Sequence, residues 1–281
     1  MQIATLTRIA AAWALATAPA WAAGTWDFSV CNGSTTAAGT ATGAQSGAGA
    51  VGNSYACAAT GSTTRDLTVS AWGAVSTTNN TYATGFLTNE GTNGFGVGAR
   101  SEGGTTTTGV NTALDNDPTT LVPNIILLRF SSAVILDKIR LGWSQNDADL
   151  TIMAYTGSAA PSTFLAGKTA ANLTTGGASA GWSLIQNVGD ASPDTAYPAS
   201  GTDINYSFNQ AGISSSYWLI SAYNASFGGG ALDSLVDYAK LLAVSTRDAV
   251  GVAEPQSLAL VGMALLAALA VRRRRSAQRS Q

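Results

Sequence analysis

Apolar and polar residues alternate along most of the central chain, with a period of two and not the 3.6 of an amphipathic helix. Alternation puts every second side chain on the same face of a strand, so each such run predicts a half-buried β-strand. Residues 124–130 form a short, nearly continuous apolar run, which favours a strand buried on both faces. The alternating runs are residues 26–30, 67–71, 95–99, 135–143, 150–154, 204–208, 217–223 and 236–244.

Clusters of Gly, Asn, Asp and Ser separate these runs, and only residues 161–173 have a locally helical pattern. About ten short strands with such punctuation predict an all-β fold, a single antiparallel β-sandwich that resembles a jelly roll. Residues 32–56 are rich in Gly, Ala, Ser and Thr and have almost no apolar anchors. This composition predicts a flexible loop.

The two ends of the chain carry targeting signals. Residues 1–22 combine one basic residue, a short apolar run and Ala20-Trp21-Ala22, which predicts a signal peptide cleaved before Ala23. Residues 257–271 carry no charge, and a helix of that length spans about 22 Å, so it crosses a membrane only marginally. By the positive-inside rule, a basic cluster after this run stays in the cytoplasm and stops translocation. The cluster is Arg272, Arg273, Arg274 and Arg275.

An acidic-proline motif, Ala253-Glu254-Pro255, stands just before the apolar run. Motif, short apolar helix and arginine cluster together resemble the PEP-CTERM sorting signal of Gram-negative bacteria. The resemblance implies that an exosortase-type enzyme processes the chain near Glu254 while the helix is held transiently in the inner membrane. The expected organisation is a signal peptide over residues 1–22, an exported domain over 23–252 and a sorting signal over 253–281.

The chain has two cysteines and no histidine. In an exported protein two cysteines most simply pair, so we expect a disulfide between Cys31 and Cys57. Closing a loop of about 27 residues would stabilise the fold by roughly 3.5 kcal/mol, an upper figure. The missing histidines exclude an imidazole general base and every zinc site with His ligands.

Residues 23–252 carry eight basic and fifteen acidic side chains, a net charge of −7. Nucleic-acid binding needs clustered Lys and Arg, so this composition argues against a nucleic-acid partner.

Several segments of the central region form a further pattern. They are Ala113-Leu114-Asp115-Asn116, residues 126–130, Leu141-Gly142-Trp143 with Asp147-Ala148-Asp149, residues 165–168 and residues 237–241. Together these segments resemble a family of exosortase-dependent surface proteins. The resemblance implies a surface β-domain without an assigned biochemical activity.

Three patterns suggest enzymatic chemistry, and each has a simpler explanation. Residues 177–181 match the G-x-S-x-G pattern of hydrolases, but without histidine no catalytic triad forms. Residues 94–99 loosely match a dinucleotide-binding fingerprint but lack the following helix, so a Gly-spaced strand is the better interpretation. Glu90 and Glu102 are the candidates for a glycosidase pair, although acids that flank a strand usually lie in solvated turns. We therefore expect no enzyme.

Acidic residues in two predicted turns are candidates for a calcium site. Calcium takes six to eight oxygen ligands, which acidic loops at strand ends supply in many extracellular β-domains. The alternative is that these Asp and Asn side chains only cap turns through local hydrogen bonds. The candidate ligands are Asp115, Asp117, Asp147 and Asp149, with Asn116 beside them.

The leading expectation is a non-enzymatic surface or matrix protein with a structural or adhesive role. The sorting-signal resemblance associates such proteins with cells that produce exopolysaccharide, which makes exopolysaccharide a candidate partner. The alternative is a carbohydrate-binding module, calcium-dependent or not, in which Trp182, Trp218 or Tyr223 stacks on sugars. The other possibility for these rings is burial in the core. A secreted glycan-active enzyme is the third hypothesis.

Overall fold

The computed structural model describes residues 23–31, 34–35, 54–60, 66–102, 112–117, 122–157, 165–175, 181–189 and 204–247. Antiparallel strands dominate these residues, so the predicted all-β class is confirmed. The helical elements are short. They are α1 (Ala170–Thr175) and four 3₁₀ turns, η1 (Phe28–Val30), η2 (Gly91–Asn93), η3 (Arg100–Glu102) and η7 (Ala225–Phe227).

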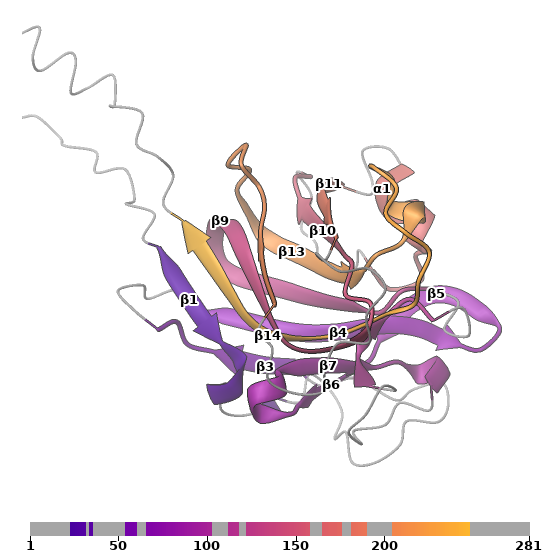
Figure 1. The fold of residues 1–281 in the computed structure, drawn as a ribbon, viewed down its shortest axis with the longest axis horizontal. Helices are drawn as coiled ribbons and strands as arrows, with labels where there is room; N and C mark the ends of the chain where they lie inside the picture. The colour runs from indigo at the N-terminus through magenta and orange to yellow at the C-terminus, as the bar shows by residue number, and fades with distance from the viewer. Residues whose placement is uncertain are drawn as a thin grey trace, which may run out of the picture.

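The strands form two sheets, here named sheet A and sheet B, which share the long strand β9 (Ile125–Asn146). Figure 1 shows β1 and β14 side by side at one edge of the molecule, as their pairing requires. Sheet A also contains β1 (Gly24–Asp27), β6 (Phe86–Asn89), β7 (Phe95–Gly98), β8 (Leu114–Asp115), β12 (Ile204–Ser207) and β14 (Asp237–Arg247). Sheet B also contains β2 (Ser34–Thr35), β3 (Ser54–Cys57), β4 (Leu67–Ser76), β5 (Asn79–Thr84), β10 (Leu150–Tyr155), β11 (Trp182–Val188) and β13 (Ser215–Ala222).

Strand β9 passes from one sheet to the other. Its first part pairs with β4 and β13 in sheet B, and its second part pairs with β14 and β12 in sheet A. Pairing in sheet B ends at Val134, and pairing in sheet A starts at Ile135. Just before this crossing, the exposed Ser131 and Ser132 interrupt the burial alternation. Corners of this kind, where a strand changes sheets through a bulge, are typical of packed sheets. Two predicted strands, 124–130 and 135–143, are therefore one.

The two ends of β9 lie close together because the strand bends back. A straight strand of 22 residues would span about 70 Å. The backbone N–H of Asn124, just before β9, donates to the carbonyl of Asp115 at 2.8 Å. The next residue, Asn116, hydrogen-bonds with Asp237, which pairs with Asn146 at the far end of β9. Asp115 and Asn116, which are adjacent in the chain, thus connect to the two ends of β9.

The main core lies between the two sheets. Apolar side chains from both sheets meet there, and the ring centroids of Trp26 and Phe130 lie 4.9 Å apart in an edge-on arrangement. A second apolar cluster covers the outer face of sheet B, where Leu173 of α1 and Phe227 of η7 pack with Trp182. All six residues of β10 are buried because apolar groups cover both faces of this strand.

Some local expectations differ from the structure. The predicted strand over residues 26–30 ends at Asp27, and Val30 in the following η1 is 60% exposed. The predicted helix 161–173 is reduced, within the described residues, to α1. The expected loop 32–56 contains β2 and most of β3, while residues 36–53 lie outside the described part.

The phase of the last strand also differs. Two register shifts in the pairing of β14 with β9, between Lys240 and Ala243, place Ala239, Leu241 and Val244 in the core. The predicted alternation through Tyr238, Lys240 and Val244 therefore selects the wrong face before the shifts and the correct face at Val244.

The disulfide between Cys31 and Cys57 is confirmed, with Cα atoms 4.9 Å apart. Cys31 follows η1 at the end of β1 in sheet A, and Cys57 ends β3 in sheet B. Both cysteines belong to the core between the sheets. The bond therefore links the two layers of the sandwich.

Replacing both cysteines, as Cys31→Ala with Cys57→Ala, should lower the free energy of unfolding by about 3.5 kcal/mol, because the unfolded chain regains loop entropy. Urea denaturation of the unreduced protein measures this difference. Thiol labelling of the denatured, unreduced wild type serves as the control and should detect no free thiol. A loss below about 1 kcal/mol would contradict a stabilising role for the bond.

Candidate functional site

Three buried aspartates meet where β9 ends and β14 begins. Asp147 and Asp149 lie in the turn between β9 and β10, and Asp237 is the first residue of β14. One oxygen from each carboxylate lies within 4.8 Å of the others. Asp147 is 0% exposed, Asp149 3% and Asp237 1%. We name this set the three-aspartate cluster.

The backbone around the turn holds the cluster in place. Asn146 adopts a φ of 60°, a left-handed conformation that Asn tolerates better than most residues, and this turns the chain at the end of β9. The Asp147 carbonyl accepts the Tyr238 N–H at 3.0 Å, and the Asp149 carbonyl accepts the Tyr223 N–H at 2.9 Å. Asp147 and Asp237 consequently form a bridge between neighbouring backbones.

The carboxylate oxygens differ in their partners. Asp237 Oδ1 accepts the Asp149 N–H at 2.8 Å, and Asp237 Oδ2 accepts the side-chain amide of Asn116. Asp147 Oδ1 accepts the Ala148 N–H at 2.8 Å. Asp147 Oδ2 is buried, and it has no hydrogen-bond partner within the described part of the chain. A buried polar atom in this state carries a desolvation penalty.

The electrostatic environment of the cluster is unfavourable for several negative charges. Burial, followed by the charges of Asp147, Asp149 and Asp233, raises the pKa of Asp237 to about 9. Burial is also the main cause that raises the pKa of Asp147 to about 7, with contributions from Asp233 and Asp149.

Three basic side chains of the described chain form ion pairs with carboxylates outside the cluster. Arg140 pairs with Asp27, Lys240 with Glu90 and Arg247 with Asp137.

A second carboxyl group pair lies beside the cluster. The amide of Asn124 donates to Asp115 Oδ2 at 3.1 Å and to Glu102 Oε2 at 3.2 Å. Burial and the charge of Glu102 raise the pKa of Asp115 to about 9, and burial raises the pKa of Glu102. Two carboxyl groups this close favour a state in which one of them keeps a proton.

The four candidate calcium ligands therefore do not form one site in the structure. Asp147 and Asp149 come together with Asp237, whereas Asp115 pairs with Glu102, and Asp117 accepts the Tyr238 hydroxyl at 2.9 Å. The turn-capping alternative also has support, because the Asp117 N–H donates weakly to Asp115 Oδ1 at 3.4 Å. Asp237 was not among the expected ligands. The one sequence feature that pointed to Asp237 was its position at the start of residues 237–241, a segment that carries the family resemblance.

These segments, far apart in the sequence, meet at one place. Residues 113–116 form part of β8 and contact β14, Asp147 bridges to Asp237, and Asn116 joins Asp237 through two hydrogen-bonded contacts.

The two glutamates considered for glycosidase chemistry are both engaged. Glu90 Oε1 lies 2.6 Å from Lys240 Nζ, and both side chains are nearly buried at 7% and 2% exposure. The Thr112 hydroxyl donates to the same oxygen at 3.0 Å, and Lys240 Nζ lies 4.6 Å from the Trp143 ring centroid. Glu102 belongs to the carboxyl pair with Asp115.

The glycine-spaced run at residues 94–99 forms β7, as the strand interpretation required. A Cβ on Gly96 would overlap the carbonyl oxygen of Thr112, so close packing of backbones explains this glycine. Residues 177–180 of the G-x-S-x-G match lie outside the described residues.

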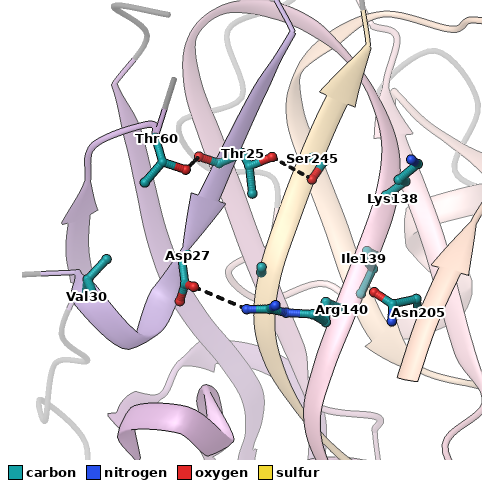
Figure 2. Close-up of a pocket in the computed structure, with 10 residues that line it drawn as sticks. Thr25, Asp27, Val30, Thr60, Lys138, Ile139, Arg140, Asn205 and Ser245 are labelled. Carbon is teal, nitrogen blue, oxygen red and sulfur yellow. Dashed lines mark hydrogen bonds and ion pairs between the residues drawn. The ribbon is translucent and has the colours of Figure 1, made fainter. Parts of the chain in front are cut away.

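A groove of about 400 Å³ lies on sheet A, and Figure 2 shows its lining. Arg140 Nη2 contacts Asp27 Oδ2 at 3.1 Å across it, and the hydroxyls of Thr25 and Ser245 lie 3.0 Å apart. These polar groups mainly interact with one another. We therefore assign the groove no ligand.

The targeting segments lie outside the described residues. These include Ala253, Glu254, Pro255 and the arginines at 272–275. Among the described residues, no helix has the length and apolarity that a membrane crossing requires. No protein-family model matches the chain, and no curated protein or solved structure matches it significantly.

The Asp115→Asn substitution should make stability less dependent on pH. Because the folded state raises the pKa of Asp115 from 3.8 to about 9, the folded protein keeps a proton that the unfolded chain releases. The stabilisation that this proton provides is therefore fully present below the pKa of Asp115 in the unfolded chain. It is lost as the pH rises toward 9. The variant should remove up to about 1.4 kcal/mol of this loss per pH unit.

Urea denaturation in chelator at pH 5, 6, 7 and 8 measures the slope. The exposed Asp66 provides a matched control, and Asp66→Asn should keep the wild-type slope. Equal slopes for wild type and Asp115→Asn would show that Asp115 is ionised in the folded protein.

Proposed function

We propose that this protein is an exported, non-enzymatic surface protein that is sorted by its C-terminal signal and has a structural or adhesive role. The observation that supports the proposal is the position of the described fold between the two targeting segments. Strand β1 begins at Gly24, directly after the predicted cleavage site, and β14 ends at Arg247, before the sorting motif at 253–255.

The pairing of the first and last strands adds to this support. Gly24 pairs with Thr246 and Asp27 with Ala243, so the fold closes on itself with both ends at one edge. A domain built in this way is completed without the segments that export and sorting would remove. The Cys31–Cys57 disulfide is in keeping with an oxidising compartment outside the cytoplasm.

The structure offers less support for a carbohydrate-binding module. The three rings considered for sugar stacking are all buried, with Trp182 at 5%, Trp218 at 0% and Tyr223 at 7% exposure. The Trp218 indole N–H donates to the Ser215 carbonyl at 2.9 Å, as a ring fixed in the core does. Stacking on sugars needs exposed ring faces, so we favour the structural or adhesive role.

Intact mass spectrometry of the protein from the cell surface tests the sorting proposal. The expected mass corresponds to a chain that begins at Ala23 and ends near Glu254, because a helix of about 22 Å is a poor permanent anchor. Replacing Arg272 to Arg275 with Gln should leave the C-terminal segment uncleaved, since the stop signal is lost. A conservative exchange of the same four residues to Lys is the control and should restore processing. Surface protein that still contains residues 257–281 would contradict the proposal.

A further inference from the structure

We propose that Asp147, Asp149 and Asp237 bind one divalent cation, and that this cation is calcium. The inference concerns a metal site within the folded domain and does not depend on the sorting signal.

The first argument is the state of the Asp147 carboxylate. Its side chain is 0% exposed and its Oδ2 has no hydrogen-bond partner among the described residues, while the oxygens of two further carboxylates lie within 4.8 Å. A buried polar atom normally finds a partner in the protein or in ordered water. A cation held between the three carboxylates would supply that partner.

The second argument is charge. The groups whose charges act most strongly on Asp237 are Asp147, Asp149 and Asp233, all of them carboxylates. Burial of several acids without a cation is costly, and the usual relief is a proton, a basic partner or a metal. The basic residues Arg140, Lys240 and Arg247 form ion pairs with other acids.

The third argument is the size and chemistry of the site. Calcium accepts six to eight oxygen ligands at 2.3 to 2.6 Å in a flexible geometry, whereas magnesium is usually held by only one or two carboxylates. Three carboxylate oxygens within 4.8 Å fit the calcium shell. The set contains no nitrogen or sulfur ligand, which disfavours zinc and copper.

The side chains around the cluster offer further coordination. Asp237 already accepts one hydrogen bond at each oxygen, but a carboxylate oxygen has a second lone pair that can bind a metal. Asp233 is exposed and its charge acts on both Asp147 and Asp237. Bidentate binding by the carboxylates, with Asp233 as a further ligand, would add to the six to eight oxygens that calcium requires.

Isothermal titration of the full-length chain in detergent tests the proposal, after removal of metals with EDTA. Calcium chloride should give one site per chain and magnesium chloride a clearly weaker site. Asp147→Asn should weaken calcium binding by at least about 10- to 100-fold, the loss typical even for an outer-shell partner of a metal site. The control variant Asp66→Asn, at an exposed carboxylate outside the cluster, should bind as the wild type does.

Hydrogen exchange of the wild-type chain provides a second readout that needs no variant. Calcium should slow exchange in peptides covering residues 143–150 and 233–239, because the ion would fix the end of β9 against the start of β14. The proposal is overturned if calcium produces neither binding heat nor protection in these peptides. Equal affinity of Asp147→Asn and wild type, or equal affinity for magnesium and calcium, would also overturn it.

Discussion

The bend of strand β9 is the constraint on which the rest of the structure depends. A single strand supplies hydrogen-bond partners to both sheets, so the path of this strand sets the position of every neighbouring strand. The two ends of the strand are brought near each other. Asp115 bonds Asn124, just before one end, and Asn116 bonds Asp237, which pairs with Asn146 at the other end. Buried carboxyl groups gather at each end as a result, Asp115 with Glu102 at one and the three-aspartate cluster at the other.

Burial of apolar side chains stabilises the fold around these polar contacts. The core between the sheets and the second cluster under α1 leave sheet B covered on both faces. The turn after β9 leads directly into β10, which is buried along its whole length, so the carboxylates of this turn are shielded from solvent. Groups of like charge held in such a place must take up a proton or a cation, and either choice would affect the stability of the whole sandwich.

Much of the fold follows from local patterns in the sequence. The period-two runs at residues 67–71, 95–99 and 150–154 lie in strands, and two isolated cysteines form the disulfide. The continuity of β9 was not predictable, because Ser131 and Ser132 resemble an ordinary turn between two strands. The face of β14 was predicted correctly only at Val244, because register shifts that depend on the neighbouring strand interrupt the alternation before it.

The site was predictable only in part, for a related reason. Asp147 and Asp149 stand together in an evident turn, but Asp237 enters the cluster through strand pairing with a segment about 90 residues away in the chain. Local pattern reasoning does not reach such a long-range contact.

Asn116 holds this pairing through its contacts with Asp237 and Tyr223, so Asn116→Ala tests the central claim most directly by hydrogen exchange. The claim predicts roughly tenfold faster exchange at both ends of β9, in residues 122–128 and 143–149. The control Asn187→Ala removes amide contacts to Gly228 and Gly230 and the hydrogen bond accepted from Thr151, so it should affect β10, β11 and that loop but leave both ends of β9 unchanged. Faster exchange at one end of β9 alone, or at neither, would contradict the claim that one segment ties both ends together.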